Sequence, residues 1–236
     1  NGTNQNNAEN LMEQGYSPEE IMEWLIENDV QNNPEIRQYG AVDLVDGGRS
    51  AAFTGQNCFD YKNHILGPTY AIQGNILLGQ EILDSMEVRY NTTTGSIAVR
   101  LMAALQGANI PGADIRCLDE GISSMSAFIR VAKVDDVDND LYLHLNVNNT
   151  PPPYSIDPID SLQTLFDIWY EENPDYQEGD VNMDFIINVL DIILVVNFIL
   201  DNMEPTEYEF WASDLNNDNL IDVLDIITLV NLIINP

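Results

Sequence analysis

Two twelve-residue segments near the C-terminus carry oxygen-bearing side chains at the same five positions, 1, 3, 5, 9 and 12. In residues 180–191, here called loop 1, these are Asp180, Asn182, Asp184, Asn188 and Asp191. In residues 214–225, called loop 2, they are Asp214, Asn216, Asp218, Asp222 and Asp225. This is the spacing of a calcium-binding loop, in which the position-7 carbonyl, here Ile186 or Leu220, adds a ligand. Because Ca²⁺ takes about six to eight oxygen ligands, the pattern predicts two calcium ions, one in each loop.

The two loops are parts of an internal repeat. Loop 2 begins 34 residues after loop 1 (180 to 214), and each loop is followed by an apolar run whose sixth residue is Asn197 or Asn231. A solvated acidic turn would explain a single loop. It gives no reason for two copies in register with matching apolar runs. The repeat therefore favours calcium binding over the acidic turn.

The repeat resembles a type I dockerin, the calcium-dependent module that binds cohesin domains on scaffold proteins. The resemblance covers about residues 177–236 and implies a small all-α fold, two Ca²⁺ ions and a cohesin-like protein partner. It places the partner-binding residues at positions 10 and 11 of each loop, which are Val189, Leu190, Val223 and Leu224. Cellulosomal dockerins usually have a small or hydroxylic pair there, so the Val-Leu pairs of this chain depart from the family's usual partner-reading residues.

Two differences between the loops predict that loop 2 binds calcium more tightly. Position 9 is Asp222 in loop 2 and Asn188 in loop 1, which gives loop 2 one more carboxylate. Position 6, where the family usually has Gly, is Asn219 or Phe185. A left-handed backbone suits Asn but strains Phe by about 1 kcal/mol. Loops without this Gly should need millimolar extracellular Ca²⁺, which indicates a secreted bacterial protein.

The larger block that precedes the repeat, residues 1–172, has mixed helix and strand signals. Ser17-Pro18-Glu19-Glu20 is typical of a helix start, and Asp46-Gly47-Gly48 of a hairpin turn. We expect strands at residues 37–45, 49–54, 69–78, 125–134 and 141–147, and helices near 21–28, 82–90, 97–105 and 159–170. Because strands and helices come in runs, the block is α+β. The polar segment at 173–179 is the expected linker to a dockerin at 180–236.

Five motifs in this block resemble an uncharacterised bacterial family, domain of unknown function number ten twenty-eight. They are Tyr39–Asp43, Ala51–Gly55, Tyr70–Asn75, Gly112–Cys117 and Pro158–Leu162. The resemblance implies an αββα sandwich of the Ntn-hydrolase type. In that fold the nucleophile is an N-terminal Thr, Ser or Cys on the first strand, whereas this chain enters the family pattern after that strand, at residues 4–13. We therefore expect an N-terminally truncated sandwich and assign no catalytic residue.

Composition excludes some partners. The chain has 39 acidic and 8 basic residues, a net charge of −31, and no Lys or Arg after Lys133. Such a surface repels phosphate backbones, so a nucleic-acid partner is excluded. The longest charge-free apolar stretch in the C-terminal third is residues 192–200. A membrane span needs about twenty apolar residues, so none is expected.

The two cysteines, Cys58 and Cys117, are expected to form one disulfide in an extracellular protein. Two buried thiols are the alternative.

Three functions are compatible with these features. The first is a secreted binding protein that a calcium-ordered dockerin attaches to a cohesin-type partner or surface complex. The second is an amide-bond hydrolase whose nucleophile lies upstream of Asn1 and which the dockerin delivers to such a complex. In the third, the repeat acts only as an intramolecular calcium clamp for the larger domain. The first is the function that we adopt as the working hypothesis.

Overall fold

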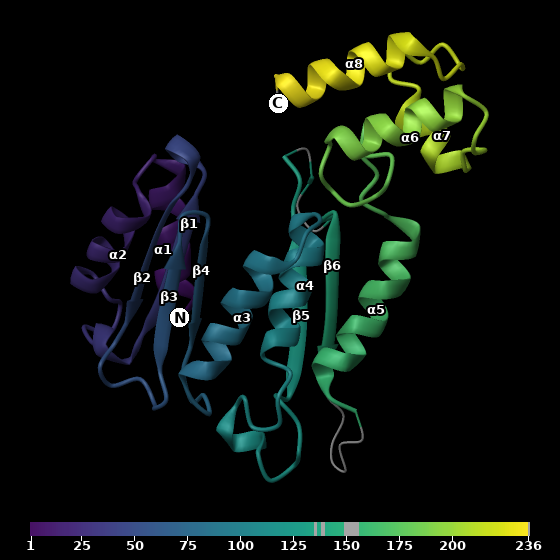
Figure 1. Cartoon of the computed structure of the whole chain (residues 1–236). Coiled ribbons are helices and arrows are strands. Elements are labelled where there is room, and N and C mark those ends of the chain that lie inside the picture. The colour runs from purple at the N-terminus through teal and green to yellow at the C-terminus, as the bar shows by residue number, and fades with distance from the viewer. Residues whose placement is uncertain (135, 138–139, 149–155, 236) are drawn as a thin grey trace. The chain divides into compact units, whose positions relative to one another are not determined.

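The computed structural model describes residues 1–134, 136, 137, 140–148 and 156–235, which divide into two units (Figure 1). The first unit contains residues 1–93 and 97–167, and the second contains residues 94–96 and the chain from 168 onward. The first unit holds α1 (Gly2–Glu13), α2 (Pro18–Glu27), β1 (Gln38–Asp43), β2 (Arg49–Thr54), β3 (Asn63–Gly67), β4 (Tyr70–Gly74), α3 (Gln80–Thr92), α4 (Ile97–Gly107), β5 (Ser126–Val131) and β6 (Leu143–Asn148). Helix α5 (Pro158–Glu172) starts in this unit, and the second unit holds α6 (Val189–Ile199), α7 (Glu207–Ser213) and α8 (Val223–Ile234).

Helix α2 begins where the sequence predicted a cap. Ser17 Oγ accepts a hydrogen bond from the Glu20 amide at 3.3 Å, and the Glu20 carboxylate accepts one from the Ser17 amide at 2.8 Å. The helix then buries Ile21 and Leu25 against the first hairpin. In that hairpin Tyr39 faces Phe53 across the ladder, with ring centroids 6.3 Å apart. Local capping and apolar spacing together fix the position of this helix.

Two hairpins lie between two helix pairs in the first unit (Figure 1). Strands β1 and β2 pair with each other and pack on α1 and α2, while β3 and β4 pair and pack on α3. The hairpins contact each other closely, since Ser50 Oγ donates to Gly67 O at 2.6 Å. A Cβ atom at Gly40 would lie 2.4 Å from Gln73 Oε1, so a larger residue there would displace the Gln73 side chain. The order of layers is therefore helix, strand, strand, helix.

The expectation of mixed helices and strands is confirmed, with differences at individual elements. Strand β4 ends at Gly74, four residues before the expected end at 78, and its partner β3 was not expected. The apolar residues of β3, Ile65 and Leu66, are adjacent, so the strand shows no alternation. Helix α1 was also not expected, because its polar sequence buries only Asn4 and Leu11. Both elements are held by tertiary contacts rather than by a local pattern.

The third hairpin, β5–β6, shows the clearest alternation. Ala127, Ile129 and Val131 are buried, and the residues between them are exposed. The strands pair antiparallel, with Ile129 opposite Leu145. Both strands were expected from the sequence.

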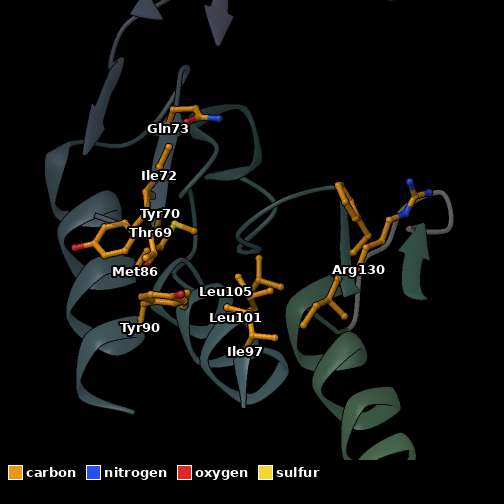
Figure 2. Close-up of a pocket in the computed structure, with 14 residues that line it drawn as sticks. Thr69, Tyr70, Ile72, Gln73, Met86, Tyr90, Ile97, Leu101, Leu105 and Arg130 are labelled. Atoms are coloured by element: carbon orange, nitrogen blue, oxygen red, sulfur yellow. The ribbon is translucent and has the colours of Figure 1, made fainter. Parts of the chain in front are cut away.

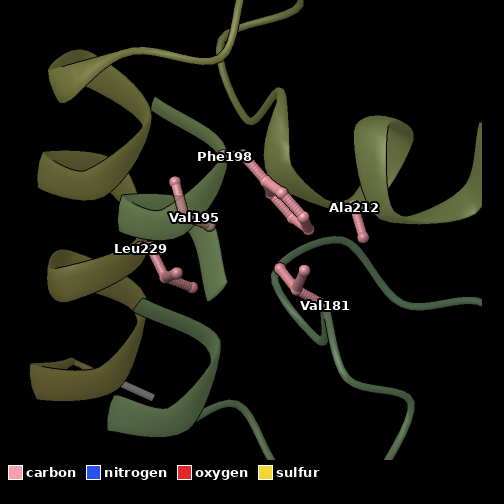
Figure 3. Close-up of a cluster of buried hydrophobic side chains, with 5 residues drawn as sticks. All are labelled: Val181, Val195, Phe198, Ala212 and Leu229. Carbon is pink, nitrogen blue, oxygen red and sulfur yellow. The ribbon is translucent and has the colours of Figure 1, made fainter. Parts of the chain in front are cut away.

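The second unit is helical and has its own core, which is formed by Val181, Val195, Phe198, Ala212 and Leu229. Val195 and Leu229 occupy equivalent positions of the repeat, 34 residues apart (195 to 229), and lie between α6 and α8 (Figure 3). Residues 173–179 contain no helix, and Pro174 and Gly179 both disfavour one in this segment. Among the described residues, no helix is both long and apolar enough to cross a bilayer.

Candidate calcium-binding loops

Loop 1 wraps its backbone amides around the carboxylates at its two ends. Asp180 accepts hydrogen bonds from the amides of Asp184 at 3.1 Å and Phe185 at 2.9 Å. One oxygen of Asp191 accepts the amide of position 2 at 2.8 Å, and the other accepts the amide of position 9 at 2.8 Å. The first and last acidic side chains thus close the loop on itself.

Loop 2 repeats this arrangement bond for bond. Asp214 accepts the amides of Asp218 at 3.0 Å and Asn219 at 2.9 Å. Asp225 accepts the amides of positions 2 and 9 at 3.0 and 2.8 Å. At position 3, Asn182 and Asn216 each accept the position-5 amide at 2.9 Å. The structural repeat therefore extends to side-chain hydrogen bonds.

Two positions in each loop have left-handed backbone. At position 4 the φ angles of Met183 and Asn217 are 57° and 58°, and at position 6 those of Phe185 and Asn219 are both 65°. The expected left-handed position 6 is confirmed, and Phe185 adopts it despite its bulk. Such a conformation is costly for a residue with a large side chain, so loop 1 carries backbone strain that loop 2 avoids.

Position 9 also begins the helix that follows each loop. Asn188 is the N-cap of α6 and accepts the Leu190 amide at 2.7 Å, and Asp222 caps α8 in the same way through the Leu224 amide at 2.7 Å. Sequence reasoning treated these residues only as ligands. The signal that it missed is an acid three residues after a capping side chain, which completes a capping box. The position-9 residue therefore belongs both to the loop and to the helix that follows it.

The carboxylates at the loop ends are buried, and among the described residues none of them forms an ion pair. Asp180, Asp191 and Asp225 are fully buried, and Asp214 is 7% exposed. No Lys or Arg occurs in the sequence after Lys133. Burial raises the pKa of Asp180, and the carboxylates of Asp191 and Asp184 add repulsion that raises it further. Buried anions that lack a counter-charge are stabilised by a dication, so these donors fit calcium.

Within each loop, backbone amides bind several of the expected ligands. Within the described part of the chain, no three acidic, histidine or cysteine side chains form a ready-made metal cluster. The donor set expected from the sequence also includes asparagine and backbone oxygens. In loop 1 the Asn188 side-chain amide donates to Ile186 O at 3.0 Å, and the Asn182 amide donates to Asp184 at 3.0 Å. Loop 2 has Asp222 at position 9, which has no amide to bind the Leu220 carbonyl.

The expected partner-binding residues form an exposed apolar surface. The exposed fractions are 60% for Val189, 52% for Leu190, 59% for Val223 and 56% for Leu224. One turn further along each helix, Ile193 and Ile227 are 51% and 53% exposed, and sequence reasoning did not include them. We call these six residues the apolar helix face. Exposed apolar side chains at helical spacing are typical of a protein-binding surface.

The expected disulfide is absent, because Cys58 and Cys117 are both free and buried. Cys58 Sγ donates to Arg37 O at 3.3 Å. Cys117 lies in a short 3₁₀ turn, Ile115–Cys117, that Asp114 caps. Burial raises the pKa of the Cys117 thiol. The prediction took the extracellular setting as its reason, but each thiol is packed in a different part of the first unit.

The first unit contains an apolar cavity of about 470 Å³ (Figure 2). Gln73 on β4 lies at one end, and Ile97 and Leu101 of α4 lie opposite Met86 and Tyr90 of α3. The described lining contains no acid, histidine or cysteine. The cavity therefore supplies no nucleophile–base pair.

Comparisons with known proteins agree with both resemblances drawn from the sequence. Residues 1–156 match the model of a family of unknown function (DUF1028), and residues 178–234 match that of the dockerin type I domain. The crystal structure of protein SPO2555 from Silicibacter pomeroyi, also DUF1028, is similar with a TM-score of 0.50 and 24% identity. The match covers 66% of this chain and 62% of that protein, so this chain spans less than two thirds of the relative's length. No curated protein matches the chain.

Proposed function

Because this chain belongs to the DUF1028 family of unknown function and carries a dockerin type I domain, we propose that it is a secreted bacterial docking protein. In this proposal two Ca²⁺ ions order the repeat, and the ordered repeat presents its apolar helix face to a cohesin-like partner. The observation that carries the proposal is the pairing, in both copies, of buried uncompensated carboxylates with an exposed Val-Leu pair. The carboxylates supply the calcium requirement and the pair supplies the contact surface.

Each ion would be held by its own loop. The donors proposed for loop 1 are Asp180, Asn182, Asp184, the Ile186 carbonyl, Asn188 and Asp191. Those proposed for loop 2 are Asp214, Asn216, Asp218, the Leu220 carbonyl, Asp222 and Asp225. A bound dication neutralises buried acids and holds the loop closed, which fixes the N-terminus of the helix that follows. Binding and folding of the repeat are then one process.

We propose that residues 1–172 form an Ntn-hydrolase-like domain, which a linker at 173–179 joins to the dockerin at 180–236. The order of layers, helix–strand–strand–helix, supports this reading. The amide-hydrolase hypothesis, whose nucleophile would lie upstream of Asn1, stays the alternative. In the proposed role, the dockerin therefore attaches the rest of the chain to a cohesin-like partner.

The test is binding of the full chain to purified cohesin modules on a sensor surface, in millimolar calcium and in chelator. We expect calcium-dependent binding that Leu190→Asp combined with Leu224→Asp abolishes, because a buried carboxylate would oppose an apolar contact. Met203→Asp is the matched control, since Met203 is 48% exposed but outside the apolar helix face. Failure of the calcium-ordered chain to bind any cohesin would overturn docking and favour the intramolecular clamp.

A further inference from the structure

The two loops differ in what supports their first residue. Loop 2 follows α7 directly, and the Asp214 amide donates to Phe210 O at 3.0 Å as a continuation of that helix. The residues before loop 1, 173–179, contain no helix. Loop 1 therefore needs support from elsewhere in the second unit.

Helix α7 provides this support through tertiary contacts. The Tyr208 hydroxyl donates a hydrogen bond to Asp180 O at 2.6 Å, across 28 residues of sequence. The Gly179 amide donates to Ala212 O at 2.9 Å, and Val181 shares the buried core with Ala212 (Figure 3). The helix that leads into loop 2 thus also holds the start of loop 1.

Neighbouring aromatic rings fix the position of the Tyr208 ring. Its centroid lies 4.7 Å from that of Tyr176 and 5.8 Å from that of Trp211. Such contacts restrict the ring and aim its hydroxyl at the Asp180 carbonyl. The equivalent position in the first copy of the repeat is Pro174, which has no hydroxyl. The tyrosine contact is therefore a feature of loop 1 alone.

We propose that Tyr208 is a positioning residue for loop 1, so that the calcium affinity of loop 1, and not that of loop 2, depends on its hydroxyl. This inference rests on the proposed calcium role of both loops. The hydrogen bond is made only in the folded loop, so it adds to the free energy of the coupled folding and calcium binding of loop 1.

The experiment follows both loops separately in the full chain. In ¹H–¹⁵N spectra recorded during a calcium titration, the amide of Phe185 reports loop 1 and that of Asn219 reports loop 2. Both amides donate to position-1 carboxylates, so calcium binding should shift both. Tyr208→Phe should weaken the loop 1 response about five-fold, the value of one ordinary hydrogen bond, and leave the loop 2 midpoint within error. Removing only the hydroxyl keeps the ring in its cluster.

The matched control is Tyr176→Phe, which removes a hydroxyl from the same cluster. Tyr176 is 56% exposed and is not part of either loop, so neither midpoint should change. Equal weakening at both loops in Tyr208→Phe would indicate a general loss of stability and would overturn the inference, as would an unchanged loop 1. If neither amide responds to calcium in the unaltered chain, the proposed function itself fails.

Discussion

The two units stabilise their aspartates in different ways. In the first unit the described ion pairs join Asp29, Asp43, Asp60 and Asp114 to basic side chains of the same unit. In the second unit the buried aspartates are bound by backbone amides, and the sequence there contains no Lys or Arg. The first unit therefore carries its counter-charges within the chain. Under the proposed function the second unit takes them from solution, so we expect its fold to depend on a metal.

Calcium removal should give the largest effect. In excess chelator we expect hydrogen exchange in α6, α8 and both loops to become fast, because the twelve carboxylates from residue 177 onward repel each other without a cation. Exchange in β1 and β2 should remain slow. Mass spectrometry of peptides from the full chain separates the two units. If α6 and α8 stay protected from exchange in chelator, the second unit does not depend on calcium, and the contrast between the two units is wrong.

The opposite effect is expected from Asp29→Asn, which should destabilise only the first unit. Asp29 accepts hydrogen bonds from Arg37 at 2.9 Å and from Asn4 at 2.6 Å, and its side chain is fully buried. Loss of its charge leaves Arg37 without its partner and should cost about 3 kcal/mol in urea unfolding. Calcium affinity should be unchanged. Asp43→Asn is the control, with a smaller loss because its partner Arg49 is 40% exposed.

The same carboxylate should make the first unit sensitive to acid. The hydrogen bond from Arg37 holds the pKa of Asp29 far below its usual range. Since the folded-state pKa is lowered, the stabilisation is complete above the unfolded value of about 4 and is lost as the pH falls through the folded value. Urea unfolding at a series of acidic pH values should therefore show a shallower pH dependence for Asp29→Asn than for the unaltered chain.

A smaller effect separates the two loops within the second unit. Phe185→Asn should raise the calcium affinity of loop 1 by about five-fold, because it relieves roughly 1 kcal/mol of left-handed strain. Loop 2 should bind more tightly than loop 1 in the unaltered chain. Calorimetry on Asp180→Ala and Asp214→Ala checks the ranking, since the tighter phase should disappear only in Asp214→Ala. The reverse result would mean that strain and charge do not set the order.

The smallest effect is expected at Ser213, whose buried hydroxyl has no hydrogen-bond partner among the residues that the structure describes. Ser213→Ala removes a polar group that gains nothing from burial, so calcium-saturated stability should stay equal or rise by up to about 1 kcal/mol. Thermal unfolding in saturating calcium measures this. A clear loss of stability would show that the Ser213 hydroxyl stabilises the junction between α7 and loop 2.

The calcium loops could be predicted from sequence because their chemistry is local. Position 1 and position 12 are eleven residues apart, and both accept hydrogen bonds from backbone amides of the same loop. The capping box of α2 and the hairpin β1–β2 were predictable for the same reason. In each case the contacting residues lie close together in the sequence, and their types and spacing predict the local backbone geometry.

The rest depended on contacts that a local pattern does not encode. The contact between Tyr208 and Asp180 crosses 28 residues and has no counterpart in the repeat. Strand β3 is a strand because β4 pairs with it, and α1 is a helix whose polar face binds Asp29 through Asn4. The cysteine pairing was wrong because compartment says nothing about whether two side chains face each other.

The two buried thiols have a further consequence. The chain contains only two cysteines, and both lie in the first unit. A thiol reagent can therefore modify the folded protein only when that unit opens. It does not label the calcium loops, which contain no cysteine. The rate of thiol labelling therefore measures how often the first unit opens, and the measurement needs no engineered probe. Labelling rates measured with and without calcium would show whether calcium in the second unit changes the opening of the first unit.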